Sequence, residues 1–550
     1  MNGADAFVAT LRAWGVDTFF GLPGSTEAPL LEAIRAEGSI RYVLGLHEGV
    51  AVAMADGYAR ASGRPGLVGL HTTVGTMNGM SQLFNSARDG VPVVLTAGHK
   101  DRYVLSEDGF CSFPDLASLL RPFTKRSWQS LVPEEVASDL ARALLAATTP
   151  PQGAAYLAVP EDLLGAPLAT PWDLAALPAV RHRSATGTPS PVELTQLAEL
   201  LQGARKPVMV LGTAAVRASR AAAQLAAEVG IAVVAAELTD LAAFSFPAAD
   251  LNYLGVYGED PAVVEGCDLV MAVGCRVFYP FSNRLRPKLP PGAQLVHIHP
   301  DPAELGRRLA TDIGVAGDPE AVLEGLRAAC RGADHAQANQ SRRQSLAQLQ
   351  EVRRAAIASE RNAAREGTPA AVSTVVAEVS RVLPQGTILL DEAVRGSRAL
   401  FRHGGVPKGG EIWRSSGGSL GWGVPAAVGA KLASPDRPVV LVVGDGSLHF
   451  SIQALWTAVV QKAPVVVVVL DNGGYLAVKR AIENLLAVAE DPRTHPGTEL
   501  PGIDHVAAAR AYGAHAVTAS TPEEAAAAVE DALAQQRVEL VAVPVARIRP

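Results

Sequence analysis

The residues best suited to chemistry lie at the ends of two apolar runs in the last third of the chain. Asp445, in a Gly-Asp-Gly-Ser segment, follows the run 439–443, and Asn472 comes 27 residues later, after the run 465–470. Such runs predict buried parallel strands, whose carboxyl ends lie together at one edge of a sheet. Aspartate and asparagine offer the hard oxygen ligands that Mg²⁺ requires, and glycines expose N–H groups to a diphosphate. Gly-Asp-Gly also makes ordinary turns, but the second strand ending in asparagine favours a metal–diphosphate site.

Three polar residues in the first third also follow expected strands. Glu48 begins an Ala- and Met-rich helix, Ser25 lies in a Gly-Leu-Pro-Gly-Ser loop, and His71 ends a strand. A partly buried glutamate can share a proton with a cofactor, a serine can bind a carboxylate, and a histidine can move protons near neutral pH. Each also has a structural interpretation: a helix N-terminal acid for Glu48, and loop or capping residues for the other two. His47, beside Glu48, is expected to be structural.

Alternating strands and helices must position these residues. The alternation occurs in three segments of similar size, which predicts three consecutive doubly wound parallel-sheet α/β domains. A proline-rich stretch follows the first segment, and a Gln-, Arg- and Glu-rich stretch with helical spacing follows the second. The expected division is a first domain at 1–165, a linker at 166–190, a middle domain at 191–330, a connecting helix at 331–368 and a third domain at 369–550.

Composition narrows the classes of protein to which the chain can belong. Of 550 residues, 48% are hydrophobic and 19% charged, which predicts large cores and excludes disorder as the main feature. The net charge of −7 argues against a nucleic-acid partner, and the longest aliphatic run has six residues, too few to span a membrane. Four cysteines without a Cys-x-x-Cys pair predict neither a disulfide framework nor a zinc site. With no secretory signal at the N-terminus, we expect a cytoplasmic protein.

The motifs resemble those of thiamine-diphosphate-dependent enzymes acting on 2-oxo acids. The Gly-Asp-Gly-Ser segment, the stretch 451–457 and the Pro-Gly-Ile-Asp segment ending at Asp504 are most similar to benzoylformate decarboxylases, and the resemblance covers nearly the whole chain. It implies pyrimidine-binding, middle and diphosphate-binding domains, with thiamine diphosphate and Mg²⁺ as cofactors. It also implies decarboxylation of a small 2-oxo acid to an aldehyde and CO₂ through ylid and enamine intermediates. Acetolactate-synthase-like carboligation and, less favoured, a catalytically silent relative remain alternatives.

The same resemblance implies roles for individual residues and for a second subunit. Glu48 would hydrogen-bond the aminopyrimidine ring, Leu420 would wedge under the cofactor, and the Gly418 carbonyl would accept from its amino group. In the family, the first and third domains meet across a subunit interface, which implies a homo-oligomer built as a dimer of dimers. The implied residues are, for catalysis, Glu48, His71 and Ser25; for the cofactor, Glu48, Gly418, Leu420, Gly444, Gly446, Ser447, Tyr475 and Arg395; and for the metal, Asp445, Asn472 and the Gly474 carbonyl.

The sequence departs from this pattern at several positions. Phe281 stands where the benzoylformate decarboxylases have a second active-site histidine, and Arg414 stands where an apolar pocket residue is expected. An arginine in the pocket would favour a substrate with a second anionic group, although it could equally point to solvent. His297 and His299 alternate on one expected strand, but no further metal ligands accompany them. The middle domain has no Gly-x-Gly-x-x-Gly fingerprint, so no nucleotide is expected there.

Overall fold

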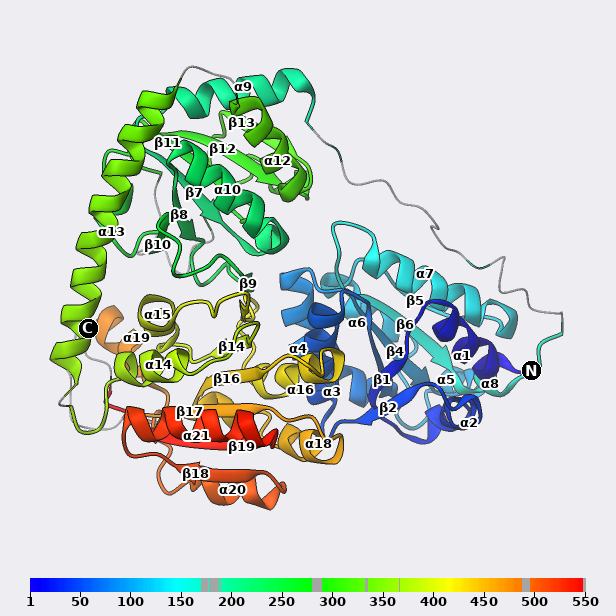
Figure 1. Ribbon diagram of the computed structural model, residues 1–550. Coiled ribbons are helices and arrows are strands. Elements are labelled where there is room, and N and C mark those ends of the chain that lie inside the picture. The colour runs from blue at the N-terminus through cyan, green and yellow to red at the C-terminus, as the bar shows by residue number, and fades with distance from the viewer. Residues whose placement is uncertain are drawn as a thin grey trace.

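The computed structural model consists of three α/β units joined by a long helix (Figure 1). It describes residues 1–169, 177, 187, 189–278, 289–331, 335–365, 367–486 and 495–547. The strands form three sheets whose pairings are parallel apart from one short edge strand, which confirms the predicted fold class. Most of the linker predicted at 166–190 lies outside the described residues.

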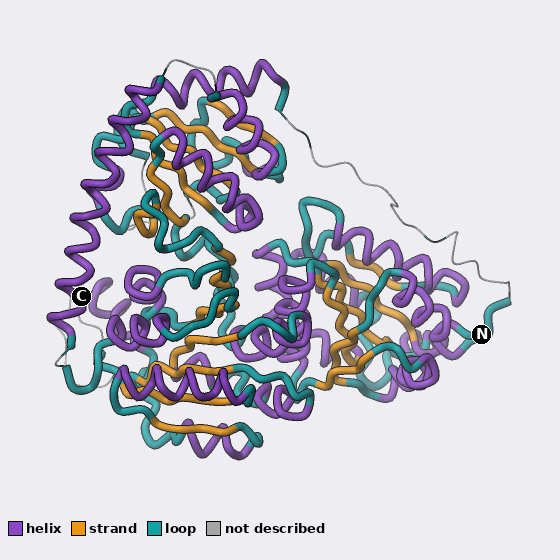
Figure 2. Tube along the Cα trace, in the orientation of Figure 1, coloured by secondary structure: helices purple, strands orange, loops and turns teal. Residues whose placement is uncertain are grey.

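The first unit is a six-stranded sheet in the order β2-β1-β3-β4-β6-β5, with helices on both faces (Figure 2). Its core strand β4 is buried along its whole length because it has neighbours on both edges and both faces. Its strands are β1 (Thr18–Leu22), β2 (Arg41–Leu44), β3 (Gly66–His71), β4 (Val93–His99), β5 (Ser127–Gln129) and β6 (Ala155–Pro160). Its helices are α1 (Gly3–Ala13), α2 (Ala28–Glu37), α3 (Glu48–Ser62), α4 (Thr72–Asp89), α5 (Arg102–Ser106), α6 (Leu116–Leu120), α7 (Val136–Thr148) and α8 (Glu161–Gly165).

The middle unit is a six-stranded sheet in the order β10-β8-β7-β11-β12-β13. Helix α13 leaves it and runs along one side of the molecule to the third unit (Figure 1). Its strands are β7 (Pro207–Leu211), β8 (Ala232–Ala235), β10 (Tyr253–Val256), β11 (Leu269–Val273), β12 (Gln294–His299) and β13 (Ile313–Ala316). The helices are α9 (Pro191–Gly203), α10 (Ser219–Val229), α11 (Pro261–Val264), α12 (Pro319–Cys330) and α13 (Ala336–Ala364).

The third unit is a seven-stranded sheet in the order β18-β19-β17-β16-β14-β15-β9. Its last strand, β9 (Ala243–Phe244), comes from the middle unit and pairs antiparallel with β15. The other strands are β14 (Ile388–Glu392), β15 (Glu411–Trp413), β16 (Val439–Gly444), β17 (Val466–Asp471), β18 (His515–Thr518) and β19 (Glu539–Pro544). The helices are α14 (Val372–Arg381), α15 (Ser397–Ala399), the π-helical turn η7 (Leu400–Gly404), α16 (Gly423–Ala433), α17 (Asp445–Leu448), α18 (Ala454–Val460), α19 (Leu476–Leu486), α20 (His505–Ala511) and α21 (Pro522–Gln535).

Helix α18 begins only at Ala454, several residues after the Gly-Asp-Gly-Ser segment. The preceding residues form successive tight turns, in which Phe450 donates its N–H to Ser447 and Ser451 donates to Leu448. These turns satisfy the backbone groups locally before the regular helix begins. None of the described helices is long and apolar enough to cross a membrane.

The first and third units touch through a close crossing of α3 and α16. A Cβ on Gly57 would lie 2.0 Å from the Ala426 carbonyl oxygen, and one on Gly429 would lie 1.9 Å from the Met54 carbonyl oxygen. Each helix therefore places a glycine against the backbone of the other. Because Met54 and Ala426 are fully buried, neither backbone has free space into which it could move.

We therefore expect Gly429→Ala to destabilise the protein by about 3 kcal/mol, because overpacking must push the two helices apart. The measurement is the midpoint of denaturant unfolding followed by tryptophan fluorescence. Gly203→Ala is the matched control, because nothing lies within 4 Å of a Cβ added there. Equal midpoints for the two variants would show that the crossing tolerates a wider separation.

Candidate active site

Three predicted site residues gather at the carboxyl edge of the first sheet. The chain leaves β1 toward β2 on one side and returns to β3 on the other, so the strand order reverses between β1 and β3. Ligands of open α/β sheets bind at such a reversal. Ser25 follows β1, His71 ends β3 and Glu48 follows β2, so the structure places all three at this edge.

His71 is held in a fixed orientation through its Nδ1 atom. The Thr26 hydroxyl donates to the Gly98 carbonyl (2.9 Å) and lies 2.9 Å from Nδ1. The same hydroxyl also lies 3.0 Å from Glu27 Oε1, so Thr26 links the imidazole to both neighbouring groups. Glu27 Oε2 lies 3.3 Å from the same nitrogen, and a Cβ on Gly24 would overlap the ring. This arrangement leaves Nε2 as the ring atom that can exchange a proton with a ligand.

Glu48 is the first residue of α3 and is half-buried. The Nδ2 amide of Asn78 donates to Glu48 Oε2 over 3.1 Å, and Gly75 leaves room for the Glu48 side chain. His47 caps the helix, because its Nδ1 accepts the N–H of Gly49 (3.0 Å). His47 therefore has the structural role that was predicted for it, while the Glu48 carboxylate stays at the edge of the sheet.

At the carboxyl edge of the third sheet, Asp445 follows β16 and Asn472 follows β17, the neighbouring strand. The Asp445 carboxylate is buried and accepts the N–H groups of Gly446 (2.9 Å) and Gly474 (2.8 Å). Burial raises its pKa above the usual value for aspartate. No cation in the described residues pairs with it, so a bound metal ion would neutralise a charge that burial disfavours.

Asp471 and His505 also lie at this site, although neither was predicted to. Single ligand atoms from Asp445, Asp471 and His505 lie within 4.8 Å of one another. His505 Nε2 is 3.5 Å from Asp471 Oδ2, and His505 lowers the pKa of that carboxyl. His449 Nε2 lies 2.9 Å from His505 Nδ1. The only sequence signals were the adjacency of Asp471 to Asn472 and of His505 to the Pro-Gly-Ile-Asp segment.

Glycines shape the space beside these oxygens. A Cβ on Gly446 would lie 2.5 Å from Tyr475 Cε1, and one on Gly474 would lie 2.2 Å from the Thr498 carbonyl oxygen. Gly474 has a φ of +156°, and its carbonyl, the predicted metal ligand, accepts the N–H of Leu476 (3.0 Å). Ser447 is buried in the turn that follows Gly444. The backbone around Asp445 is thus packed as closely as a Gly-rich diphosphate loop requires.

The segment that carries Gly418 and Leu420 is held by the first unit. Asn85 donates to the Ser419 carbonyl (2.8 Å), and Gln82 donates to the Leu420 carbonyl (2.9 Å). Gly418 has a φ of +84°, and nothing lies within 4 Å of a Cβ added there. Hydrogen bonds from the first unit therefore hold the segment on one side, while the space beside Gly418 is open to a ligand.

Glu392 anchors the other end of this segment and was not predicted. Its buried carboxylate accepts the N–H groups of Gly421 (2.7 Å), Trp422 (3.1 Å) and Gly423 (2.8 Å) at the start of α16. Burial raises the pKa of Glu392 to about 7. Its sequence signal was its place at the end of an expected strand, but its three partners lie about 30 residues away and could not be anticipated.

The structure shows which way Arg414 points, for which the sequence left two alternatives open. Its side chain is only 12% exposed, and its Nε lies 3.2 Å from Asp391 Oδ2, so it does not point to solvent. Its guanidinium stacks over Phe401 at 6.0 Å from the ring centroid.

Arg395 is exposed on the loop after β14, as a diphosphate-facing residue would be. Phe281, where the second active-site histidine was expected, lies outside the described residues.

His297 and His299 do not form a metal site within the described residues. His297 Nε2 bonds the Cys275 carbonyl (2.9 Å), and the N–H of Asp301 donates to His299 Nδ1 (3.0 Å). Burial lowers the pKa of both imidazoles. On β12, both histidines therefore form hydrogen bonds with nearby backbone groups.

A buried charge network joins all three units behind the candidate site. Arg60 Nε lies 2.7 Å from Asp56 and its Nη2 lies 2.7 Å from Asp89, while Nη1 donates to the carbonyls of Ala242 and Arg414. Burial opposes the charge of Arg60, but the two carboxylates more than compensate and raise its pKa. Asp89 also accepts from the N–H and hydroxyl of Ser416, which begins the segment that carries Gly418.

The middle unit joins this network through Arg276. Its Nε lies 2.5 Å from Asp240, and its Nη2 donates to Ser416 (2.9 Å). The network lines a cavity of about 600 Å³ bounded by residues of all three units. The position of the Ser416–Leu420 segment therefore depends on packing between the units.

Family models match the three units in order. The model of the N-terminal thiamine pyrophosphate binding domain matches residues 1–119, that of the central domain matches 194–326, and that of the C-terminal thiamine pyrophosphate binding domain matches 400–543. The chain belongs to the thiamine pyrophosphate enzyme family. It is thus a thiamine-diphosphate-dependent enzyme of the decarboxylase and carboligase type, and the predicted family is confirmed.

Individual relatives of this thiamine pyrophosphate enzyme are similar over their whole lengths. A benzoylformate decarboxylase of Pseudomonas aeruginosa is 34% identical and covers 98% of both chains. An acetolactate synthase large subunit of Haemophilus influenzae is 28% identical over 97% of this chain and 92% of its own. The solved structure of a thiamine diphosphate-dependent 4-hydroxybenzoylformate decarboxylase from Rhodococcus jostii RHA1 has a TM-score of 0.86, 31% identity and 99% coverage of both chains.

We expect Asp89→Asn to destabilise this enzyme by about 3 kcal/mol, because it leaves the buried Arg60 with one carboxylate fewer. Thermal unfolding at fixed pH measures the effect. Asp531→Asn breaks an exposed pair with Arg537 and serves as the control, with a loss below about 1 kcal/mol. A loss for Asp89→Asn as small as that of the control would show that Asp56 alone neutralises Arg60.

Proposed function

We propose that the enzyme is a Mg²⁺-dependent decarboxylase that converts a 2-oxo acid of the benzoylformate type into an aldehyde and CO₂. The observation that carries this proposal is the placement of the His71 imidazole, with Nε2 available, beside Ser25 and Glu48 at the reversal of the first sheet. Two whole-length relatives, from Pseudomonas and Rhodococcus, are decarboxylases of benzoylformate and 4-hydroxybenzoylformate.

The third unit supplies the donor set for the metal and the diphosphate. We assign Mg²⁺ to the oxygens of Asp445, Asn472 and the Gly474 carbonyl, which are the hard ligands it prefers. The buried, cation-free carboxylate of Asp445 fits such an ion. The diphosphate and ring contacts of the cofactor are assigned to Gly444, Gly446, Ser447, Tyr475, Arg395, Gly418 and Leu420. When bound, thiamine diphosphate supplies a carbon nucleophile and accepts the electron pair released with CO₂.

The first unit then handles the protons. The Glu48 carboxyl would bind the aminopyrimidine ring and share a proton with it, for which a half-buried position is suited. Ser25, exposed at the first position of the short 3₁₀ turn Ser25–Glu27, would hydrogen-bond the substrate carboxylate. His71 would deliver a proton from Nε2 to the carbon that becomes the aldehyde, while Thr26 and Glu27 hold Nδ1.

Arg414 bears on the choice of substrate. Its guanidinium lies beside the Asp391 carboxylate and over the ring of Phe401, while its buried Nε and Nη1 have no hydrogen-bond acceptor. The carboxylate of Asp391 offsets the positive charge that would favour a second anionic group on the substrate. A monoanionic aromatic 2-oxo acid is consistent with this arrangement.

A substrate panel tests the proposal: benzoylformate, 4-hydroxybenzoylformate, a branched 2-oxo acid and a dicarboxylic 2-oxo acid. We expect aldehyde and CO₂ from the aromatic acids, and a loss of about 10²–10⁴-fold in kcat for His71→Ala with cofactor binding unchanged. His335→Ala is the control, because His335 precedes α13 and belongs to neither sheet edge that carries the predicted site. Accumulation of a 2-hydroxy ketone in place of free aldehyde would identify a carboligase, and no turnover by the cofactor-loaded enzyme would reject the substrate class.

We also propose that each site is completed by a second subunit. In the described chain, no hydrogen bond or ion pair links Glu48, Ser25 or His71 to Asp445, Asn472 or Gly418. Apolar side chains near both edges are exposed by 42–56% in a single chain, which is typical of an interface. They are Leu46, Val74, Met77 and Phe450. A homodimer, paired in the family into a dimer of dimers, would cover them and shield the reacting carbon from water.

Mixing inactive variants tests this sharing. Glu48→Gln and Asp445→Ala should each be nearly inactive, whereas hybrid dimers contain one intact site. A randomly mixed sample should recover about a quarter of wild-type activity, since half of its dimers are hybrids with one working site of two. A mixture of two separately prepared Glu48→Gln samples is the control. If native mass spectrometry shows hybrids but no activity returns, the site is built within one chain.

A further inference from the structure

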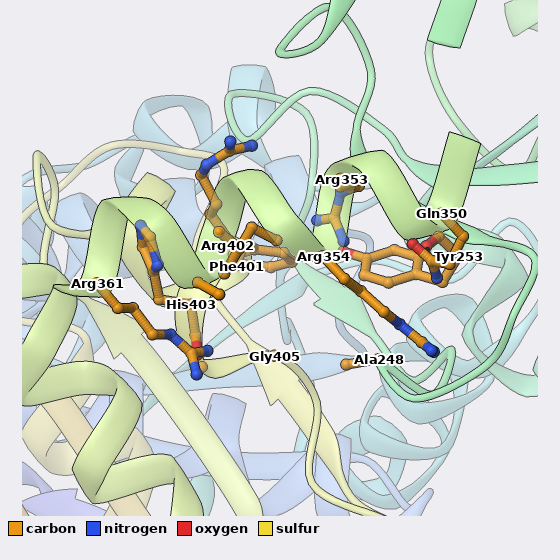
Figure 3. A pocket seen from close by; sticks show the side chains of 13 residues that line it. Ala248, Tyr253, Gln350, Arg353, Arg354, Arg361, Phe401, Arg402, His403 and Gly405 are labelled. Carbon is orange, nitrogen blue, oxygen red and sulfur yellow. Dashed lines mark hydrogen bonds between the residues drawn. The ribbon is translucent and has the colours of Figure 1, made fainter. Parts of the chain in front are cut away.

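A cavity of about 250 Å³ lies where α13, the middle unit and the third unit meet, and none of its lining residues belongs to the candidate active site (Figure 3). Tyr253 of β10 and Ala248 line it from the middle unit, and the η7 residues Phe401 to Gly404 line it from the third. We call it the α13 pocket. Its charged lining residues are Arg353, Arg354, Arg361 and Arg402. His403 also lines it, but burial lowers the pKa of this imidazole to about 4, so it is neutral near pH 7.

One face of α13 supplies most of this charge. Gln350, Arg353, Ile357 and Arg361 recur at three- and four-residue spacing, which places them on one side of a helix. The first three are buried, and Arg361 is half-buried at the next turn. Figure 3 shows Arg354 and Arg361 leaving α13 on the side on which Ala248 and Gly405 lie, while Arg402 extends in another direction.

The acids of this region neutralise only part of the positive charge. Glu360 pairs with Arg402 through two short bonds (2.6 and 2.7 Å) and lies 3.5 Å from His403. Glu259 and Asp260 act on Arg353 electrostatically but form no ion pair with it. Within the described residues, the guanidinium groups of Arg353, Arg354 and Arg361 have no carboxylate partner.

Two of these guanidinium groups are also poorly satisfied. Arg353 is 8% exposed and has only the ring of Tyr253 beneath it, at 5.8 Å, with no hydrogen bond to the described chain. Arg361 donates from Nη2 to the His403 carbonyl, but its buried Nε has no acceptor. His403 is 7% exposed, and its Nδ1 is likewise without a partner. Buried charges and donors left in this state are costly, so a ligand that satisfies them would be stabilised.

We propose that the α13 pocket binds a small dianionic oxyanion, a phosphate ester or a dicarboxylate, through Arg353, Arg354 and Arg361. Guanidinium groups match the planar oxygen pairs of both kinds of anion, and several of them around one pocket favour a double negative charge. The site is independent of the proposed decarboxylase chemistry. It lies between the middle and third units, so an occupant would contact both.

Occupancy would therefore strengthen the joint between the middle and third units. Phe401 lies on the wall of the pocket, and its ring centroid is 6.1 Å from that of Phe244 in β9. The guanidinium carbon of Arg414 lies 6.0 Å from the same Phe401 centroid. Arg414 in turn lies beside Asp391, at the end of β14. An anion that orders η7 thus acts on residues that continue to the edge of the third sheet.

The test uses the holoenzyme, saturated with thiamine diphosphate and Mg²⁺ so that the diphosphate site is filled. Inorganic phosphate and, separately, succinate are titrated by calorimetry at constant ionic strength. We expect saturable binding of at least one probe, about tenfold weaker in Arg354→Gln and lost in the double variant Arg353→Gln/Arg361→Gln. Arg343→Gln, on an exposed part of the same helix, is the matched control and should bind like the wild type.

Arg354 is exposed, so Arg354→Gln and the charge-reversed Arg354→Glu remain decisive if the double variant fails to fold. The Arg354→Glu variant should bind more weakly than Arg354→Gln. Binding of phosphate alone or of succinate alone identifies which oxyanion the pocket accepts. No saturable binding of either probe by the wild type, or equal affinity in the wild type and the Arg354 variants, would overturn the proposal.

Discussion

The buried guanidinium of Arg60 is the interaction on which the arrangement of the three units depends. A charge at this depth is tolerable only when it is paired, and Asp56 and Asp89 of its own unit pair with it. Its remaining hydrogen bonds go to backbone carbonyls of the middle and third units. Because Asp89 also holds Ser416, the same carboxylate that neutralises Arg60 positions the segment that carries Gly418. The geometry of the site is thus a consequence of how the units pack.

The three sheets use the same topological position for different purposes. Each has a reversal of strand order within the sheet, at β1/β3, β7/β11 and β14/β16. In the first unit, Ser25, Glu48 and His71 at the reversal are at least partly exposed, whereas in the third unit the Asp445 carboxylate is buried in a Gly-rich turn. In the middle unit, Arg276 follows β11 and turns to Asp240 and Ser416 instead. In the middle unit, the residue at the strand reversal therefore helps to hold the middle and third units together.

Much of the fold and about half of the site's architecture could be predicted from sequence, because those features are local. Apolar runs ending in polar residues indicated β16 and β17, and so placed Asp445 and Asn472 at one edge. The approach of His505 to Asp471 could not be predicted, since it depends on how the segment before α20 returns to the sheet. The pairing of Arg414 with Asp391 was missed for the same reason: the two residues are brought together by adjacent strands of the third sheet.

The short strand β9 has a consequence for the evolution of such chains. It belongs to the middle unit in sequence, yet it covers the outer edge of β15 in the third sheet. An uncovered edge strand invites pairing with other chains. Recombination that exchanged the middle unit for an unrelated one would expose this edge unless the new unit brought an equivalent strand. Inheritance of the middle and third units is therefore expected to be linked, even though each has its own sheet.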